Sequence, residues 1–129
     1  MERLLLAIRC QRVSAEEYPL RLLFQNIVGN AIKYHRPEQP PCVHVSAQRD
    51  GSNWTFSVAD NGIGIKSENA EKIFAAFKRL HGGTYPGTGL GLAMCKKIVE
   101  RYYGRIWVES DGRDGSKFRF TLPVADGQT

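Results

Sequence analysis

The chain has few cysteines and no long hydrophobic run, and these two shortages exclude several classes of protein. Its three cysteines, Cys10, Cys42 and Cys95, are odd in number and scattered, so they indicate reduced thiols rather than a disulfide framework or a Cys-x-x-Cys metal site. The longest early apolar run, residues 4–8, is far shorter than the roughly 20 residues that cross a bilayer. No secretory cleavage pattern follows it. We expect a cytoplasmic protein with no membrane contact by this segment.

Low-complexity tracts, internal repeats and concentrated charge are also missing. The composition, 42% hydrophobic and 24% charged, is typical of an ordinary globular protein. The length of 129 residues is enough for one domain and too short for two. The formal net charge of +5 is spread along the chain, and no zinc-finger or RNA-recognition signature accompanies it. We therefore predict no nucleic-acid partner; separately, we expect this segment to be a monomer.

A strong helical pattern begins at residue 20. Apolar residues recur every three or four positions over residues 20–32, and Pro37 closes the segment. Asn26, Asn30 and Lys33 follow at i, i+4 and i+7, so they are predicted to line the opposite face. Amide oxygens suit Mg²⁺, and a lysine one turn further on can meet phosphate charge. In isolation, however, two helical asparagines are more simply a solvated face.

Two strands are predicted next, over residues 43–48 and 54–60. The Asp-Gly pair within residues 50–52 favours a hairpin turn between them. Period-two alternation gives the second strand an apolar row that Asp60 continues on the same face. A carboxylate is thus expected at the end of a buried row.

The rest of the chain predicts helices and a second hairpin. In order, these are a helix, a connector, a long helix and two strands, over residues 67–77, 78–86, 88–103, 105–110 and 116–122. In the long helix, apolar residues recur every four positions at Leu90, Met94, Ile98 and Tyr102, and Gly104 is expected to end it.

Two glycine motifs suggest ligand chemistry. Residues 87–92, GTGLGL, stand where a loop becomes a helix, and the unpaired N–H groups of a helix's first turn form a seat for phosphate. Residues 60–65, DNGIGI, combine a carboxylate that can accept a bond from an exocyclic amine with glycines that leave room for a flat base. Alone, either motif also fits a tight loop or a common turn after a strand.

The order of these motifs resembles the ATP-binding catalytic domain of bacterial sensor histidine kinases, in the GHKL superfamily that also contains DNA gyrase, MutL and a heat-shock chaperone. The matching N, G1, F and G2 boxes are NIVGNAIKY (26–34), DNGIGI (60–65), IFAAFKRL (73–80) and GTGLGL (87–92). Residues 79–81 and 85–87 are similar to kinases linked to bacterial phytochromes.

The resemblance implies a fold and a domain division. The fold is an α/β two-layer sandwich of the Bergerat type, in which a mixed, mostly antiparallel sheet packs on three main helices. The ATP-binding domain covers residues 20–123. Residues 1–19 match poorly, and residues 124–129 form a tail.

It also implies roles for single residues in binding Mg²⁺ and ATP. Asn30, helped by Asn26, would hold magnesium, while Lys33 and Tyr34 would face the phosphates or the ribose. Asp60 would bond the adenine amino group. The pocket floor would comprise Gly62, Gly64 and Ile65, and Thr121 would touch the base through water.

The implied lid and phosphate cradle lie further along the chain. Phe74 and Phe77 would anchor a mobile lid over residues 78–86, although core packing is the simpler role for at least one of them. Arg79 of the lid would reach the terminal phosphate and, with Asn26 and Lys33, complete the catalytic set. The cradle would consist of Gly87, Thr88, Gly89, Leu90 and Gly91.

One position indicates which reaction follows. Members of the superfamily that hydrolyse ATP carry a glutamate four residues before the magnesium asparagine, and here that position is Asn26, which cannot act as a general base. Transfer to a histidine needs less help, because neutral imidazole is already a nucleophile.

The acceptor is expected outside this segment. His35, His44 and His81 are not in a phosphoacceptor motif, so we expect a phosphoacceptor domain in the same full-length protein or in trans, and a response regulator downstream. Two alternatives remain: a serine kinase of the anti-sigma type, and a module in which ATP gates a protein interaction without transfer.

Overall fold

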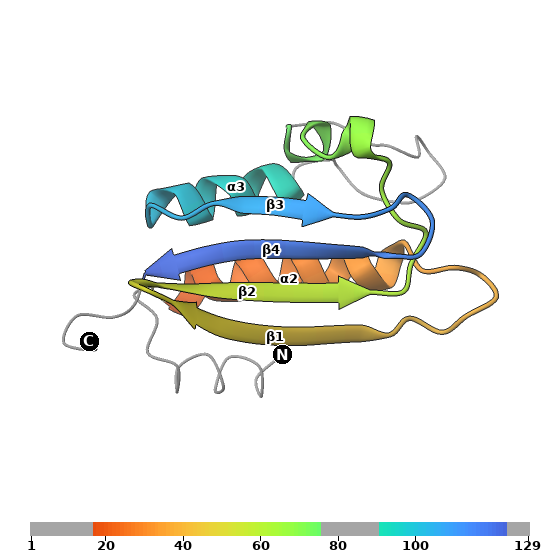
Figure 1. Cartoon of the computed structure of the whole chain (residues 1–129), viewed down its shortest axis with the longest axis horizontal. Coiled ribbons are helices and arrows are strands. Elements are labelled where there is room, and N and C mark those ends of the chain that lie inside the picture. Colours follow the sequence, from red (N-terminus) through yellow and green to blue (C-terminus); the bar gives the residue numbers. More distant parts are fainter. Residues whose placement is uncertain (1–16, 76–90, 124–129) are drawn as a thin grey trace.

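A four-stranded sheet forms one layer of the protein (Figure 1). The computed structural model describes residues 17–75 and 91–123. The strands, in the spatial order β1-β2-β4-β3, are β1 (Val43–Asp50), β2 (Asn53–Asp60), β4 (Ser116–Pro123) and β3 (Ile106–Glu109). The sequence predicts a mixed, mostly antiparallel sheet, and every strand pair within the described residues is antiparallel.

Both predicted hairpins are present. β1 and β2 pair from Val43 with Asp60 to Asp50 with Asn53, so only two residues form the turn. Gly51 in that turn has a φ of 64°, a left-handed conformation that glycine adopts without steric cost. The strands reach further toward the turn than the sequence predicts.

Two α-helices, α2 (Glu17–Lys33) and α3 (Gly91–Arg101), cover one face of the sheet (Figure 1). The α/β fold class is therefore confirmed. None of the helices within residues 17–75 and 91–123 has both the length and the apolar character needed to cross a membrane.

The helix predicted over residues 67–77 is wrong in its described part. Two short 3₁₀ helices, Ser67–Asn69 and Lys72–Phe74, replace it, and Ala75 is already extended at φ −82° and ψ 143°. Ile73 and Phe74 are the buried residues of this stretch. Because a single turn suffices to bury both side chains, packing contributes little that would favour a longer helix.

The core lies between α2 and the two central strands. The rings of Phe24, Phe56 and Phe120 form its centre, with centroid separations of 5.9, 5.2 and 5.2 Å. Phe56 and Val58 are buried and Asp60 is half-buried, so the carboxylate ends a buried row as predicted.

Two details of the helices differ from the sequence pattern. Ile32, expected on the apolar face of α2, is 49% exposed. Successive side chains on an α-helix point about 100° apart, so Ile32 lies away from the buried face that Ala31 occupies. In α3 the buried residues are Cys95 and Val99, whereas Met94 is 41% exposed. The buried stripe is thus shifted by one position from the predicted row.

The end of α3 is a Schellman motif in which Tyr103, and not Gly104, is left-handed, at φ 64°. The Tyr103 N–H donates to Glu100 O at 3.0 Å, and the Gly104 N–H donates to Val99 O at 2.8 Å. Gly104 serves a different purpose, because a Cβ there would collide with the carbonyl oxygen of Thr121.

Candidate functional site

Three predicted motifs meet at one end of the sheet, where α2 and β2 end and α3 begins (Figure 1). The Ile63 N–H donates to Tyr34 O at 3.1 Å, which joins the loop after β2 to the end of α2. A Cβ on Gly91 would lie only 2.6 Å from Asn26 Oδ1, so the first turn of α3 rests against the asparagine face of α2. The structure therefore brings the Asn-bearing helix, the Asp60 loop and the start of α3 together.

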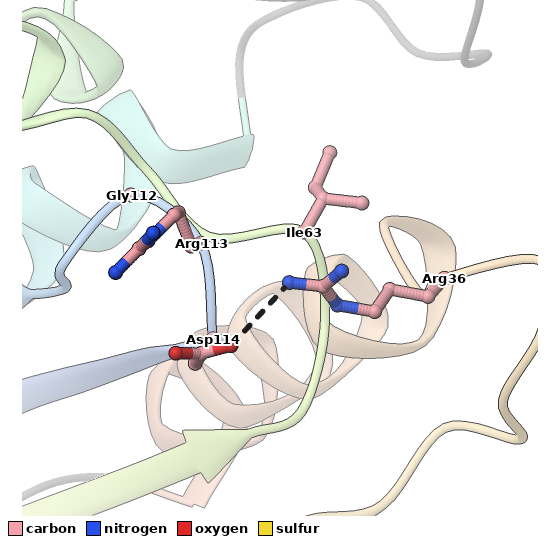
Figure 2. A pocket seen from close by; sticks show the side chains of 5 residues that line it. All are labelled: Arg36, Ile63, Gly112, Arg113 and Asp114. Atoms are coloured by element: carbon pink, nitrogen blue, oxygen red, sulfur yellow. Dashed lines mark ion pairs between the residues drawn. The ribbon is translucent and has the colours of Figure 1, made fainter.

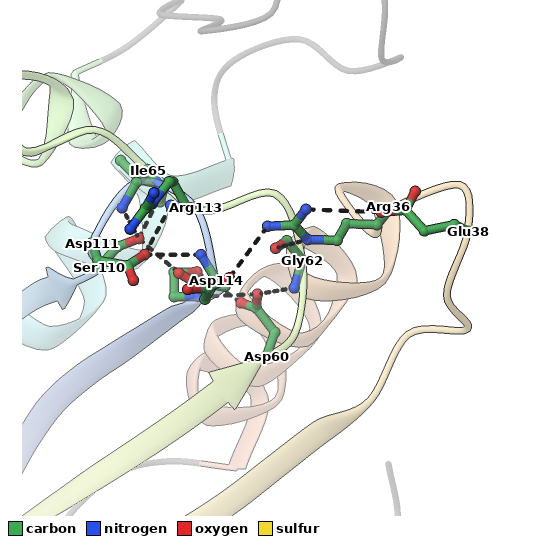
Figure 3. Close-up of polar contacts among 12 residues, drawn as sticks. Arg36, Glu38, Asp60, Gly62, Ile65, Ser110, Asp111, Arg113 and Asp114 are labelled. Carbon is green, nitrogen blue, oxygen red and sulfur yellow. Dashed lines mark hydrogen bonds and ion pairs between the residues drawn. The ribbon is translucent and has the colours of Figure 1, made fainter.

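Asp60 is held by one residue of its own loop and by one residue that is distant in sequence (Figure 3). Its Oδ1 accepts from the Gly62 N–H at 2.9 Å and from the Ser116 N–H at 3.2 Å, and its Oδ2 accepts from Ser116 Oγ at 2.8 Å. A carboxylate offers about four acceptor positions, so these three bonds orient the group and leave capacity for one more donor.

Ser116 is a site residue that the sequence interpretation missed. It lies directly opposite Asp60 in the β2–β4 pairing. The two residues are 56 positions apart, so no local sequence pattern predicts their contact. Thr121, the residue expected near the base, is not brought to Asp60. It pairs with Thr55, five positions along β4 from Ser116, and strand alternation turns it to the other face of the sheet.

The glycines of the loop allow other backbone segments to approach. A Cβ on Gly62 would lie 2.6 Å from Tyr34 O, and one on Gly64 would lie 2.8 Å from Arg113 N. Gly64 also has a φ of 81°. The described contacts thus give both glycines a packing role in the loop itself.

The turn between β3 and β4 supports the other end of this loop. Ser110 Oγ accepts from the Ile65 N–H at 2.9 Å and from the Gly112 N–H at 3.1 Å, and it donates to Gly115 O at 2.7 Å (Figure 3). Ile65 also packs against the core. Sequence interpretation missed Ser110 because its bond to Ile65 joins segments 45 positions apart.

Asp111 shapes the same turn. Its Oδ1 accepts from the backbone N–H groups of Arg113 and Asp114, both at 2.8 Å. These bonds, led by the one from Asp114, hold the pKa of the exposed Asp111 carboxyl below its ordinary value.

The polar side chains of α2 carry amide oxygens that suit Mg²⁺ and an ammonium group that suits phosphate. Asn26 Nδ2 donates to Leu22 O at 2.8 Å, so its Oδ1 is directed to the start of α3. Asn30 is half-buried one turn later. Lys33 Nζ lies 4.8 Å from the ring centroid of Tyr34. Two neutral amide oxygens and an ammonium group on one helix suit a cation that arrives with a triphosphate.

Other predicted residues are core or lie outside the described ranges. Phe74 packs edge-on against Phe118, with centroids 6.2 Å apart, so core packing is its role in the described structure. The residues predicted on the lid and in the phosphate cradle that fall outside the described ranges are Phe77, Arg79, Gly87, Thr88, Gly89 and Leu90.

An open pocket of about 550 Å³ lies where the end of α2, the loop after β2 and the β3–β4 turn meet (Figure 2). It is lined by Arg36, Ile63, Gly112, Arg113 and Asp114. Asp60 is not among these described lining residues, so the pocket lies beside the carboxylate rather than around it.

This combination of a layered α/β fold, an asparagine-bearing helix, an Asp-Asn-Gly loop and a glycine at the start of the next helix defines an ATP-binding domain of the histidine-kinase type. The chain belongs to the family described as histidine kinase-, DNA gyrase B- and HSP90-like ATPase, which it matches over residues 15–126.

Known relatives agree with this assignment. The chain is 51% identical over 113 residues to cyanobacterial phytochrome A of Nostoc sp. (strain PCC 7120 / SAG 25.82 / UTEX 2576), covering 87% of this chain and 15% of that protein. The chain therefore spans about a seventh of that relative's length.

Solved structures of histidine kinases have the same fold. The mycobacterial sensor histidine kinase MprB gives a TM-score of 0.76 at 26% identity, over 88% of this chain and 77% of that one. Full-length ShkA in complex with AMPPNP gives 0.76 at 32% identity, over 88% and 23%. Over most of its length the chain is therefore similar to the catalytic, ATP-binding domains of histidine kinases.

Proposed function

We propose that the chain binds Mg-ATP and donates its γ-phosphate to a histidine on a separate phosphoacceptor domain, in the same full-length protein or in trans, with a response regulator downstream. The observation that carries the proposal is the meeting of the Asp60 loop, Asn26 and the first turn of α3 at one end of the sheet. The likeness to a kinase solved with AMPPNP supports the choice of nucleotide.

Adenine recognition is assigned to Asp60. Its carboxylate is fixed by Gly62 and Ser116 and retains an acceptor position for the amino group of the base. The Ser116 hydroxyl supports the carboxylate, and Thr121 would contact the base only through water. Ile65, half-buried at the end of the loop and packed against the core, would support the floor of the adenine site.

The phosphates are assigned to the polar face of α2. Asn26 and Asn30 would hold magnesium, which when bound neutralises phosphate charge. Lys33 and Tyr34 would face the phosphates or the ribose. The lid residue Arg79, the anchor Phe77 and the cradle from Gly87 to Gly91 complete the proposed site.

Transfer is favoured over hydrolysis because no carboxylate stands at position 26. The amide of Asn26 cannot take a proton from water, and its nitrogen is already bonded to Leu22 O. A neutral imidazole nitrogen attacks the γ-phosphorus without prior deprotonation, the bond to the bridging oxygen breaks, and ADP leaves. We propose that this occurs in the cytoplasm, with the segment monomeric and without nucleic acid.

A phosphotransfer assay tests the proposal. The purified chain is mixed with Mg-ATP and a separately made helical hairpin that carries a phosphoacceptor histidine. Label that is acid-labile and base-stable supports the proposal. Acid-stable label indicates a serine kinase of the anti-sigma type, and binding without transfer to any acceptor indicates an ATP-gated interaction module.

A titration tests the nucleotide site itself. Asp60→Asn is expected to weaken ATP binding by roughly 10- to 100-fold, the loss expected for a hydrogen bond to a charged group. The matched control is Asp50→Asn, the same charge change at the exposed end of β1. Unchanged affinity in Asp60→Asn would contradict the assignment of the adenine pocket.

A further inference from the structure

Arg36 connects the three segments around the candidate site (Figures 2 and 3). Arg36 lies three residues after the end of α2, and its side chain is 29% exposed. The Nε donates to Gly62 O at 3.2 Å. One terminal nitrogen lies 3.8 Å from Asp114 Oδ1, in the β3–β4 turn, and the other lies 3.8 Å from Glu38 Oε1.

The bond to Gly62 restrains the peptide that follows this glycine. The C=O of that peptide accepts from Arg36, and its N–H, on Ile63, donates to Tyr34 O at 3.1 Å. Glycine has the widest conformational freedom of any residue, so its geometry here depends on bonds from outside the loop. Both outside bonds come from the residues just after α2.

Gly62 in turn orients Asp60, because its own N–H donates to Oδ1 of the carboxylate at 2.9 Å. The path from Arg36 to the carboxylate is therefore two hydrogen bonds long and passes through one residue. On the other side, Asp114 is two positions before Ser116, the second residue that holds Asp60.

We propose that Arg36 is a positioning residue of the nucleotide site, which through Gly62 fixes the Asp60 carboxylate and so strengthens the preference for adenine over guanine. The inference rests on the proposed function. Adenine presents an amino donor where guanine presents a carbonyl acceptor. A carboxylate in a fixed orientation bonds the amino group and repels the carbonyl oxygen, whereas a loosely held one discriminates less.

Two substitutions separate the hydrogen bond from the charge. Arg36→Gln removes the charge but places its Nε2 where arginine has Nε, because both atoms are fourth from Cα. Arg36→Met has a side chain about as long as that of glutamine, but it has neither a hydrogen-bond donor nor a charge. Should Arg36→Met not fold, Arg36→Lys takes its place, since it keeps the charge and puts a methylene where Nε stood.

The experiment measures affinities for Mg-ATP and Mg-GTP by calorimetric titration of the whole chain, with thermal unfolding of each variant. We expect Arg36→Met to weaken ATP binding about fivefold, the effect of about one hydrogen bond, and to leave GTP binding within twofold. The ATP-to-GTP ratio then falls about fivefold. Arg36→Gln is expected to keep the ratio within twofold of the original protein.

Two controls address charge. Arg113→Met removes a positive charge from the same pocket. Asp114→Asn removes the negative partner of the 3.8 Å ion pair with Arg36, and a solvent-exposed ion pair contributes little free energy. Both are expected to leave the ratio within twofold.

Three results would overturn the inference. An unchanged ratio in Arg36→Met, an equal loss for both nucleotides, or an Arg36→Gln variant as impaired as Arg36→Met would each show that Arg36 does not act through the Gly62 bond. The proposed function fails separately, if the original chain does not bind ATP or if Asp60→Asn binds it unchanged.

Discussion

Asp60 and Ser116 face one another across β2 and β4, and both carboxylate oxygens of Asp60 accept bonds from this one serine. The Ser116 hydroxyl bond measures 2.8 Å and the backbone bond 3.2 Å. The backbone bond is independent of the side chain, so removal of the hydroxyl loosens the carboxylate without releasing it.

Ser116→Ala is accordingly expected to weaken ATP binding about three- to tenfold and to lower the free energy of unfolding by about 1 kcal/mol. Thr121→Ala is the matched control. Its hydroxyl accepts from the Arg105 N–H at 2.9 Å, so it is expected to cost similar stability without loss of affinity. Calorimetric titration and urea unfolding of both variants check this, and equal affinity losses would contradict it.

Alanine at Gly64 and at Gly29 is expected to have opposite effects on stability. Gly64 has a φ of 81°, and its new Cβ would meet Arg113 N and Gly112 C at 2.8 Å, so Gly64→Ala is expected to destabilise by roughly 1–3 kcal/mol. Gly29 is an exposed residue inside α2 with nothing within 4 Å of a Cβ. Gly29→Ala is expected to stabilise by about 0.5–1 kcal/mol.

Thermal unfolding of the two variants measures the difference. The expectation fails if Gly64→Ala unfolds at or above the temperature of the original protein.

Gly91→Ala is expected to separate binding from stability. The added Cβ would lie 2.6 Å from Asn26 Oδ1, and that atom is the end of a side chain that can rotate away. Folding is therefore expected to change by less than about 1 kcal/mol, whereas the proposed magnesium ligand is displaced. The measurement is ATP affinity with and without Mg²⁺; the variant should lose most of the gain that Mg²⁺ confers. A full gain in the variant would contradict the role of Asn26.

Cys95 is expected to make the protein less stable at alkaline pH. Burial raises the pKa of this thiol from its ordinary value of 9.0 to about 12, so the folded state keeps its proton where the unfolded state releases it. Its contribution to stability is complete below pH 9 and is lost as the pH rises from 9 toward 12, by at most about 1.4 kcal/mol per pH unit.

Denaturant unfolding of the original protein and of Cys95→Ala between pH 8 and pH 11 checks this, because other titrating groups affect both alike. The original protein should lose stability more steeply above pH 9. Parallel curves would contradict the prediction. In addition, iodoacetamide should alkylate the exposed Cys42 before Cys95.

The features that sequence predicts well are those with local causes. The helix bearing Asn26 follows from a periodicity within one segment, and the first hairpin follows from the Asp-Gly pair at its turn. The position of Asp60 at the end of a buried row follows from strand alternation alone.

The features that sequence missed depend on pairing between distant segments. Ser116 reaches Asp60 only because β4 lies between β2 and β3, an order that no local pattern encodes. That Ser116, and not Thr121, lies opposite Asp60 depends on the register between β2 and β4, which the sequence of either strand alone does not fix. The helix expected over residues 67–77 is absent from the described part because a single 3₁₀ turn already buries Ile73 and Phe74, a packing outcome that local propensity does not encode.

The central place of β4 has a consequence for how the protein is made. A ribosome releases β2 well before β4, so during synthesis Asp60 stays without the serine that orients it until the final strand has entered the sheet. The adenine site proposed around Asp60 would therefore be complete only after β4 has paired with β2. A nucleotide that binds only the completed sheet would stabilise the folded state relative to the partly folded chain.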